Sequence, residues 1–363
     1  MWLTAIIGSS TAFIEATLAQ LYKEEDPLYG GYRGGPAYYM HKFFQKNKKQ
    51  TRWFPLSVLF AISGLICWCG ISQVISNSVA SSFENAFNIP PLYSTIVLVI
   101  LGAVIVLRKN ATVKALDAIV PVMAGLYLLI TMGVILLNIG QIPAVLERIF
   151  SEAFGLRQAV AGGIGAVIMN GVKRGLFSNE AGLGSAAIAS AAAQNRNPVR
   201  QALISSSGPF WDTVIICALT GIVLTTSIIA HPDISCTDGP RLTTLAFSKI
   251  PYIGSPLLTL SLVTFVVSTI LGWSYFGEKA LEYLGGIRLI MPYRVIWVAA
   301  VFIGCVSKIE LVWIFADCAN GLMALPNLIS LLALSGVLVQ QTRYYLWQHR
   351  LDDYDESHIP EGK

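Results

Sequence analysis

The sequence predicts an all-α integral membrane protein, a bundle of about nine transmembrane helices. Of the 363 residues, 54% are hydrophobic and only 13% are charged, whereas ordinary soluble domains carry about 25% charged residues. The apolar residues gather in continuous runs that alternate with short polar stretches. A spanning helix needs about 20 apolar residues, whereas a transmembrane β-barrel would show alternating segments of about 10 residues. The runs therefore favour helices.

The runs also define the domain organisation. We place them at residues 1–21, 54–87, 91–107, 117–138, 158–186, 201–230, 256–284, 292–307 and 310–346. Residues 1–347 are expected to form a single transmembrane domain, and residues 348–363 a cytoplasmic tail. Several runs exceed one span, which predicts tilted or interrupted helices. The connecting segments 140–158 and 231–251 each have room for a short helix, either as a plain connector or as a lid over a vestibule.

Basic residues set the orientation of the bundle. Eighteen of the 25 Lys and Arg residues fall on the side that holds the first connection and the C-terminus, and five fall on the other side. The two remaining residues, Lys173 and Arg174, lie inside a run. This bias predicts a cytoplasmic C-terminus and, with nine spans, an N-terminus outside. A nucleic-acid partner is not expected, because it would need a basic stripe on one soluble face.

The fifth run is the most irregular. Its many glycines weaken a helix, and its charged and amide side chains would be costly against lipid. A helix broken at GLFSNEAG and facing the bundle interior explains both features. Broken helices expose helix ends and backbone carbonyls, which bind ions and zwitterions in many transporters. The alternative is a closely packed Gly-rich helix with an internal ion pair. The broken-helix motif comprises Gly175, Asn179, Glu180 and Gly182.

The seventh run carries a face of hydroxyl groups. Ser261, Thr264, Ser268 and Thr269 recur at three- to four-residue spacing and so share one side of a helix, with Trp273 one turn further. Such neutral oxygens suit a Na⁺ held together with backbone carbonyls. The alternative is that these side chains pack between helices or bond to their own backbone.

Other polar residues inside runs have plainer interpretations. Gln73 and Asn77 form a polar face at i, i+4 spacing, for which contact between helices is the simpler role. Asp212 and Asp317 are either coupling sites or paired structural charges, and we favour the second.

No enzyme signature accompanies these features. The sequence has no G-x-x-x-x-G-K-[ST] loop, so an ATP-driven pump is not supported. Its four His lie in or beside loops, and none accompanies a nucleophile and a carboxylate in a recognisable triad. We expect no catalytic activity, no cofactor and no metal other than a transported cation.

The segment GVKRGLFSNEAGLGSAAIASAAA (171–193) closely resembles the signature of the alanine/glycine:cation symporter (sodium:alanine symporter) family. The segments 32–40, 268–286 and 311–327 fit the same family, and the resemblance runs from Met1 to about Gln341. It implies a leucine-transporter-like inverted-repeat helical bundle in a bacterial-type inner (cell) membrane. It also implies Na⁺- or H⁺-coupled uptake of small neutral amino acids, alanine or glycine, by alternating access.

The same resemblance implies site residues by motif position. The substrate would contact Gln73, Phe177, Thr269 and Trp273. The Na⁺ ion would be held by Ser268, Thr269 and the carbonyl of Phe265. Glu180 keeps a proton-linked role open, with an ordinary ion pair as its alternative.

One departure from the family bears on activity. In the family, two helices precede the segment that begins here at Met1, and the second of them is a core helix broken at a Gly-Thr-Gly-Asn-type motif. No such motif occurs in these 363 residues. We therefore expect a bundle lacking its first core helix, which folds poorly or transports little, because each unsatisfied polar group in lipid costs several kcal/mol. The alternative functions are a non-transporting membrane amino-acid sensor and a degenerate scaffold protein.

Overall fold

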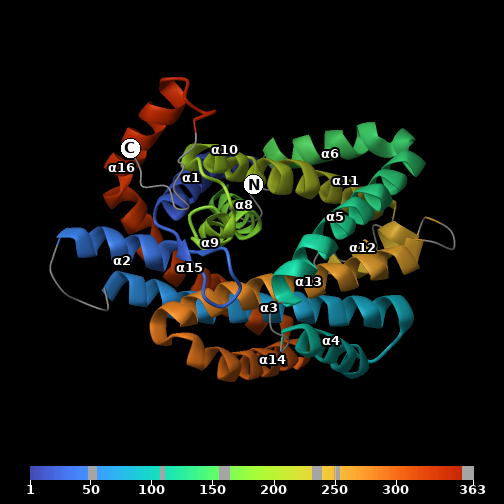
Figure 1. Cartoon of the computed structure of the whole chain (residues 1–363). Helices are drawn as coiled ribbons and strands as arrows, with labels where there is room; N and C mark the ends of the chain where they lie inside the picture. The colour runs from blue at the N-terminus through green and yellow to red at the C-terminus, as the bar shows by residue number, and fades with distance from the viewer. Residues whose placement is uncertain are drawn as a thin grey trace.

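The structure, a computed structural model, describes residues 1–47, 55–106, 111–154, 164–230, 239–248, 250 and 254–353. Almost all of them lie in helices (Figure 1). The long helices are α1 (Trp2–Leu21), α3 (Pro55–Phe87), α5 (Ala111–Leu137), α13 (Gly254–Gly285), α14 (Ile290–Val306) and α15 (Ile309–Ala333). The shorter helices are α2 (Pro36–Asn47), α4 (Pro91–Val106), α6 (Ile142–Phe154), α8 (Ile164–Asn179), α9 (Ser185–Ala192), α10 (Pro198–Ser206), α11 (Cys217–Ala230), α12 (Gly239–Ser248) and α16 (Ser335–Thr342).

A few short elements complete the chain. The 3₁₀ turns are η1 (Ile139–Gln141) and η4 (Ile287–Leu289), and the π-helical segments are η3 (Phe210–Ile216) and η5 (Arg343–Trp347). Strands β1 (Glu24–Glu25) and β2 (Tyr32–Arg33) form an antiparallel hairpin between α1 and α2, with Glu24 opposite Arg33.

Seven stretches among the described residues are long and apolar enough to cross a membrane. They are Trp2–Leu21, Pro55–Glu84, Ala118–Leu137, Pro198–Ala230, Pro256–Gly285, Ile287–Val306 and Glu310–Ala333, and each overlaps one of the predicted runs. The two other predicted runs contain α4 and α8, which have only 16 residues each. The count of nine spans therefore stays a prediction, whereas a multi-pass helical membrane protein is what the structure supports.

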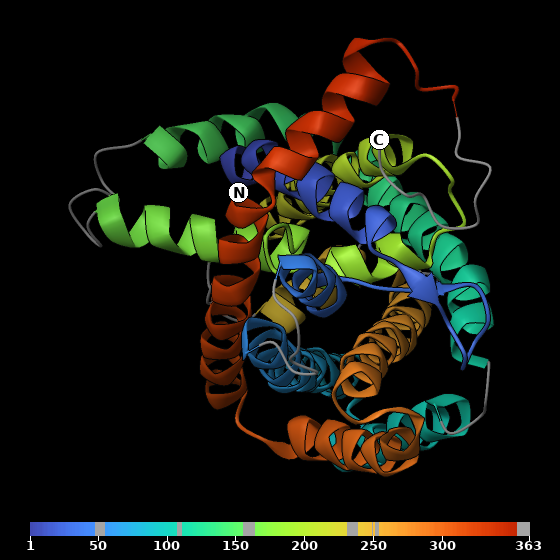
Figure 2. The ribbon, with the colours of Figure 1, turned by 60° about the vertical axis from the view of Figure 1, so that its left-hand side comes forward.

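The helices form two packed groups. In one group α3 packs against α13, α14 and α15, with α4 beside α14 and α5 beside α13 (Figure 1). In the other, α1 packs against α8, α9 and α10. Figure 2 shows the second group stacked on the first. α2 contacts α1 as well as α3, α13 and α15, and α9 contacts α13, so these two short helices join the groups.

The main hydrophobic core fills the space where the groups meet. Its largest buried side chains include Phe60, Trp68, Trp273 and Trp297. The ring centroid of Trp68 lies 6.3 Å from that of Phe60 and 6.1 Å from that of Phe276, both in edge-to-face geometry. Such aromatic pairs add about 0.5–1.5 kcal/mol beyond the burial of apolar area.

Both long connecting segments contain a short helix, as the sequence predicts. α6 lies within residues 140–158 and α12 within residues 231–251, and both pack against α11. Residues 155–158, 231–238, 249 and 251 lie outside the described part of the chain. The role of these helices as lids stays a prediction.

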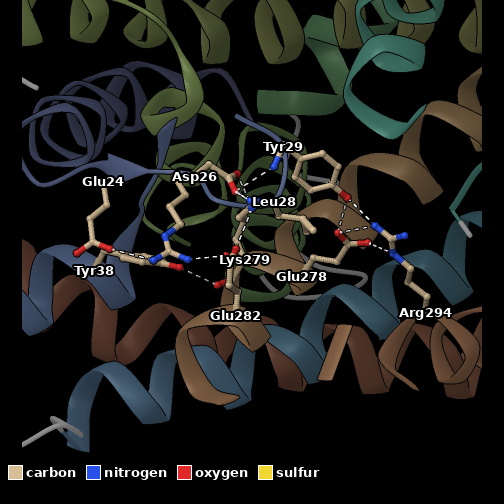
Figure 3. Close-up of polar contacts among 10 residues, drawn as sticks. Glu24, Asp26, Leu28, Tyr29, Tyr38, Glu278, Lys279, Glu282 and Arg294 are labelled. Atoms are coloured by element: carbon tan, nitrogen blue, oxygen red, sulfur yellow. Dashed lines mark hydrogen bonds and ion pairs between the residues drawn. The ribbon is translucent and has the colours of Figure 1, made fainter. Parts of the chain in front are cut away.

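A cluster of buried charges joins the β1–β2 hairpin to the end of α13 (Figure 3). The ammonium of Lys279 lies 2.5 Å from a carboxylate oxygen of Asp26 and 2.9 Å from one of Glu282. Arg33 pairs with Glu282 and, at 3.3 Å, with Glu24. The side chains of Lys279, Asp26 and Glu282 are at most 1% exposed. Charges this deeply buried must be paired, because water is absent to solvate them.

A second arm of this charge cluster extends to α14. The Arg294 guanidinium contacts both carboxylate oxygens of Glu278, at 2.7 and 3.2 Å, and donates to the Tyr29 hydroxyl at 2.7 Å. Burial, reinforced by the Glu278 charge, raises the pKa of Tyr29 above its ordinary value of 10.0. The hydroxyl therefore keeps its proton and donates a hydrogen bond to the Glu278 carboxylate. The cluster thus connects the hairpin with both α13 and α14.

Replacing Lys279 by Met should strongly destabilise the protein. The substitution leaves Asp26 and Glu282 buried without their shared cation, and breaking a buried pair in this way costs about 3–5 kcal/mol. The melting temperature of the purified protein in detergent should fall by several degrees. Arg148→Ala is the matched control, because its pair with Glu152 is exposed and worth less than about 1 kcal/mol. Equal melting temperatures for the two variants would contradict the prediction.

Candidate functional site

The helix predicted in the fifth run is interrupted in the middle of the bundle. α8 ends at Asn179, and α9 begins at Ser185. Between them, Glu180, Gly182 and Gly184 have positive φ angles of 55°, 89° and 89°. Left-handed backbone at these three positions cannot continue an α-helix. The interruption, residues 180–184, is called the helix break below.

Side chains from the break itself satisfy part of its backbone. The Asn179 carboxamide oxygen accepts from the Ala181 amide at 3.1 Å. The Leu183 amide donates to the Glu180 carbonyl at 3.0 Å. The Ser185 hydroxyl donates to the Glu180 carboxyl group at 2.7 Å, which places the Glu180 side chain beside the first turn of α9. The buried amide nitrogen of Asn179 has no partner among the described residues.

Two distant helices satisfy two more backbone groups of the break. Glu15 of α1 accepts from the Gly184 amide at 3.0 Å, and Asn327 of α15 donates to the Gly182 carbonyl at 3.0 Å. Asn327 also donates to Glu15 at 2.5 Å and accepts from the Tyr39 hydroxyl. These residues were not among the predicted site residues. A single carboxylate in the first apolar run was the only sequence signal for Glu15.

Glycines let the neighbouring helices approach closely. Gly175 lies inside α8, and a Cβ there would fall 2.0 Å from the Thr4 hydroxyl of α1. A Cβ on Gly184 would fall 2.5 Å from Pro36 and 2.7 Å from Phe60. Gly175 therefore packs α8 against α1, whereas Gly184 supplies both the backbone angle and the space that the break needs.

Phe177 of α8 packs against Trp313 of α15, beside the ion pair of Arg174 and Asp317. Its ring centroid is 5.0 Å from that of Trp313. The Arg174 guanidinium lies 4.1 Å from the Trp313 ring and 3.2 Å from Asp317. Asp317 is thus a paired charge, the interpretation that the sequence favoured. Asp212 is instead held by hydroxyl groups, those of Ser178 and, at 3.2 Å, Thr213.

Two hydroxyl groups on this face of α13 bond to carbonyls of their own helix, whereas the buried Ser261 hydroxyl has no partner among the described residues. Thr264 donates to Leu260 and Ser261 carbonyls, at 3.0 and 2.9 Å. Ser268 is buried, and its hydroxyl lies 2.9 Å from the Phe265 carbonyl. The Ser268 hydroxyl is also 3.3 Å from the sulfur of Met123 in α5. These contacts agree with the alternative of local backbone bonding, and the Na⁺ role of this face stays a prediction.

The four predicted substrate residues lie on three helices, and the structure places only Trp273 and Phe177 at the same hydrophobic core. Trp273 is buried in the main hydrophobic core, its ring centroid 5.5 Å from that of Phe276, and Phe177 packs against the same core. Thr269 is half-buried on α13. Gln73 turns to α14 instead, where its amide donates to the Ala300 carbonyl at 3.2 Å. Phe265, whose carbonyl was assigned to Na⁺, is 47% exposed.

The polar face around Gln73 ties α3 to α14. Asn77 donates to the Gly304 carbonyl at 3.0 Å and to the Ser307 carbonyl at 2.7 Å. A Cβ on Gly304 would fall 2.5 Å from the Cα of Gln73. This is the contact between helices that the sequence offers as the simpler role. Within the described residues, no three His, Cys, Asp or Glu side chains gather closely enough to hold a metal ion.

Comparison with known proteins gives consistent matches along the chain. Residues 1–359 match the model of the sodium:alanine symporter family. The chain is 42% identical to the sodium/alanine symporter AgcS of Methanococcus maripaludis over 348 residues, which cover 95% of this chain and 76% of that protein. It is 39% identical to the probable sodium/glutamine symporter GlnT of Bacillus subtilis, covering 96% of this chain and 72% of that protein. The amino-acid carrier protein AlsT of Bacillus subtilis is 36% identical, with 96% and 73% covered.

Replacing Gly184 by Ala should destabilise the helix break. A left-handed non-glycine residue costs about 1–3 kcal/mol, and the new methyl group would collide with Pro36 and Phe60. The melting temperature in detergent should fall. Gly221→Ala in α11 is the control, because no atom lies within 4 Å of its added Cβ and Ala favours a helix by about 0.5–1 kcal/mol. A Gly184→Ala protein as stable as Gly221→Ala would contradict the role of Gly184.

Proposed function

The chain belongs to the sodium:alanine symporter family, and from that membership we propose that it is a Na⁺-coupled symporter of small neutral amino acids, alanine or glycine. Transport would proceed by alternating access in a leucine-transporter-like inverted-repeat bundle. The charge bias supports a cytoplasmic C-terminus, which would place the hairpin and the charge cluster at the cytoplasmic side.

The helix break is the observation that carries this proposal. It lies inside the bundle between α1 and α15, and its backbone groups depend on side chains from both helices. Irregular backbone is tolerated at membrane depth only where it is buried in protein or lines a cavity. Transporters use such interrupted helices to bind the charged groups of zwitterions and the coupling ion. A small amino acid with one ammonium and one carboxylate suits a site of this kind.

The proposed substrate contacts are Phe177 beside the break, Thr269 and Trp273 on α13, and Gln73 on α3. Phe177 and Trp273 border the same hydrophobic core, which suits the small apolar side chain of alanine. Gln73 would have to exchange its contact with the Ala300 carbonyl for one with the substrate. The proposed ion ligands are Ser268, Thr269 and the Phe265 carbonyl, whose oxygens lie within one turn of α13.

The first test is uptake of labelled alanine by the purified 363-residue chain in liposomes, with and without an imposed Na⁺ gradient. Glycine and glutamine should be tested as competitors, because one relative is named a sodium/glutamine symporter. Gradient-driven alanine uptake would support the symporter and contradict the expectation of poor transport. Alanine binding without flux would favour a sensor, and neither binding nor flux would favour a degenerate scaffold.

Replacing Trp273 by Ala should raise the KM for alanine at least about tenfold, which corresponds to ~1.4 kcal/mol of binding. Trp297→Ala is the matched control, since Trp297 is also buried in the same core but is not proposed to contact the substrate. Both variants should lose stability, by about 3–5 kcal/mol, so uptake is measured per folded protein. Equal changes of KM in the two variants would remove Trp273 from the proposed site.

Ser268→Ala and Thr269→Ala should each raise the Na⁺ concentration for half-maximal uptake by about three- to tenfold, the loss expected for one polar contact. The maximal rate at saturating Na⁺ should change less. Thr264→Ala is the control, because this hydroxyl lies on the same helix and bonds only to carbonyls of its own turn. A Na⁺ dependence that is unchanged in both test variants would place the ion elsewhere.

A further inference from the structure

α9 is too short to be stable by itself. It has eight residues, Ser185–Ala192, and isolated helices shorter than about 12–15 residues are marginal even in water. Each end of a helix leaves four backbone groups without intrahelical partners. The residue before α9 is Gly184, which has no side chain to cap it. The groups at both ends must therefore be satisfied from outside the helix.

The first end of α9 is held by Glu15. This side chain is fully buried in α1, and one of its carboxylate oxygens accepts from the Gly184 amide at 3.0 Å. Asn327 donates to the same oxygen at 2.5 Å, and the second oxygen has no partner among the described residues. The Glu15 carboxyl group thus supplies an acceptor at the end of α9 where backbone amides lack intrahelical partners. Glu180, the acidic residue of the break itself, accepts instead from the Ser185 hydroxyl.

The second end of α9 is held by Gln20 of α1 and by Lys23, which follows α1. Gln20 donates to the carbonyl of Ser190 and, at 3.1 Å, to that of Ala193. Lys23 donates to the carbonyls of Ala193 and Asn195 at 3.2 and 3.0 Å, and to Gln20 at 2.7 Å. Burial lowers the pKa of Lys23 to about 8, so the side chain is still mainly charged at neutral pH. This cation lies at the negative end of the α9 dipole.

The spacing of these contacts matches the length of α9. Glu15 bonds at position 184, Gln20 at positions 190 and 193, and Lys23 at positions 193 and 195. Positions on both segments increase together, so the two run in the same direction. Glu15 and Gln20 lie about one and a half turns apart on α1, and Lys23 follows the end of that helix, so the three side chains together span about the length of the eight-residue α9. α1 packs directly on α9, so the contacts of Glu15 and Gln20 lie along one helix interface, and those of Lys23 lie just beyond it.

We propose that α1 and the residues just after it clamp α9 by both ends. Glu15 of α1 holds the Gly184 amide, Gln20 of α1 holds a carbonyl of the last turn, and Lys23, just after α1, holds the carbonyls that follow it. Glu15 is thereby a positioning residue for the helix break. The effect on substrate binding rests on the proposed function, because it requires the break to lie at the substrate site. The effect on the backbone of α9 and of the helix break does not depend on the proposed function. Glu15 acts through the Gly184 amide, and nothing in its role requires contact with substrate.

The test compares Glu15→Ala, Glu15→Gln and Gln20→Met with the wild-type protein in detergent. Amide hydrogen exchange of residues 181–193 is measured by mass spectrometry, and alanine uptake is measured in liposomes. Thr17→Ala is the matched control, because Thr17 is also fully buried in α1 but bonds only to the Phe13 carbonyl of its own helix. Gln20→Met keeps the test informative if Glu15→Ala does not fold, because it removes contacts at the other end alone.

In Glu15→Ala, the amides of residues 181–186 should exchange about tenfold faster, since one hydrogen bond that resists local opening is lost. The KM for alanine should rise by a similar factor. Glu15→Gln retains the acceptor oxygen and should stay within about threefold of the wild type on both readouts. Gln20→Met should speed exchange at residues 188–193. Thr17→Ala should leave all these peptides unchanged.

Unchanged exchange at residues 181–186 in Glu15→Ala would overturn the clamp, and so would an effect of Glu15→Gln as large as that of Glu15→Ala. A wild-type protein that neither binds nor transports alanine would defeat the proposed function alone. Hydrogen exchange would still decide whether α1 holds α9, so the two failures are distinguishable.

Discussion

Backbone groups freed by the helix break must find hydrogen-bond partners inside the bundle, and the surrounding structure depends on how they do so. Hydrocarbon offers no donor or acceptor, so each unpaired amide or carbonyl would cost several kcal/mol. α1 and α15 supply the partners through Glu15 and Asn327. These two side chains also bond to each other, 312 positions apart in the sequence. The break therefore fixes the placement of both helices around it, with α9 joining this group to α13.

Much of the fold could be predicted from the sequence, because length and hydropathy govern which helices can span a bilayer. The runs around α1, α3 and α13 are long and apolar, and each forms a helix near its predicted position. Two shorter helices, α4 and α8, leave the number of spans open. The charge cluster could not be predicted. Nothing in the sequence marks Asp26 and Lys279 as partners, because they lie far apart until the fold brings them together. From the charge bias alone, Lys279 is expected to be a cytoplasmic surface charge.

In the candidate site, too, features set by local sequence could be predicted, whereas features set by contacts between distant residues could not. Glycine and Asn-Glu chemistry near residue 180 predicted a break, because backbone conformation is a local property. Glu15 was missed because a carboxylate in an apolar run has no meaning until its partner is known. Gln73 and Ser268 were assigned to ligands from motif positions, yet here they bond to the Ala300 and Phe265 carbonyls. A polar side chain in a helix has several possible partners, and sequence spacing alone does not choose among them.

The charge cluster has a consequence for the order in which the protein assembles. Asp26 and Lys279 are separated by 253 positions, and synthesis at about 5–20 residues per second would take roughly 10–50 s to cover that distance. During that time Glu24 can already pair with Arg33 of the same hairpin, but Asp26 lacks the Lys279 cation that pairs with it in the finished fold. The hairpin must therefore stay hydrated while the middle of the chain enters the membrane, and its burial follows the arrival of α13. The last third of the chain to be made thus completes the packing of the first forty residues.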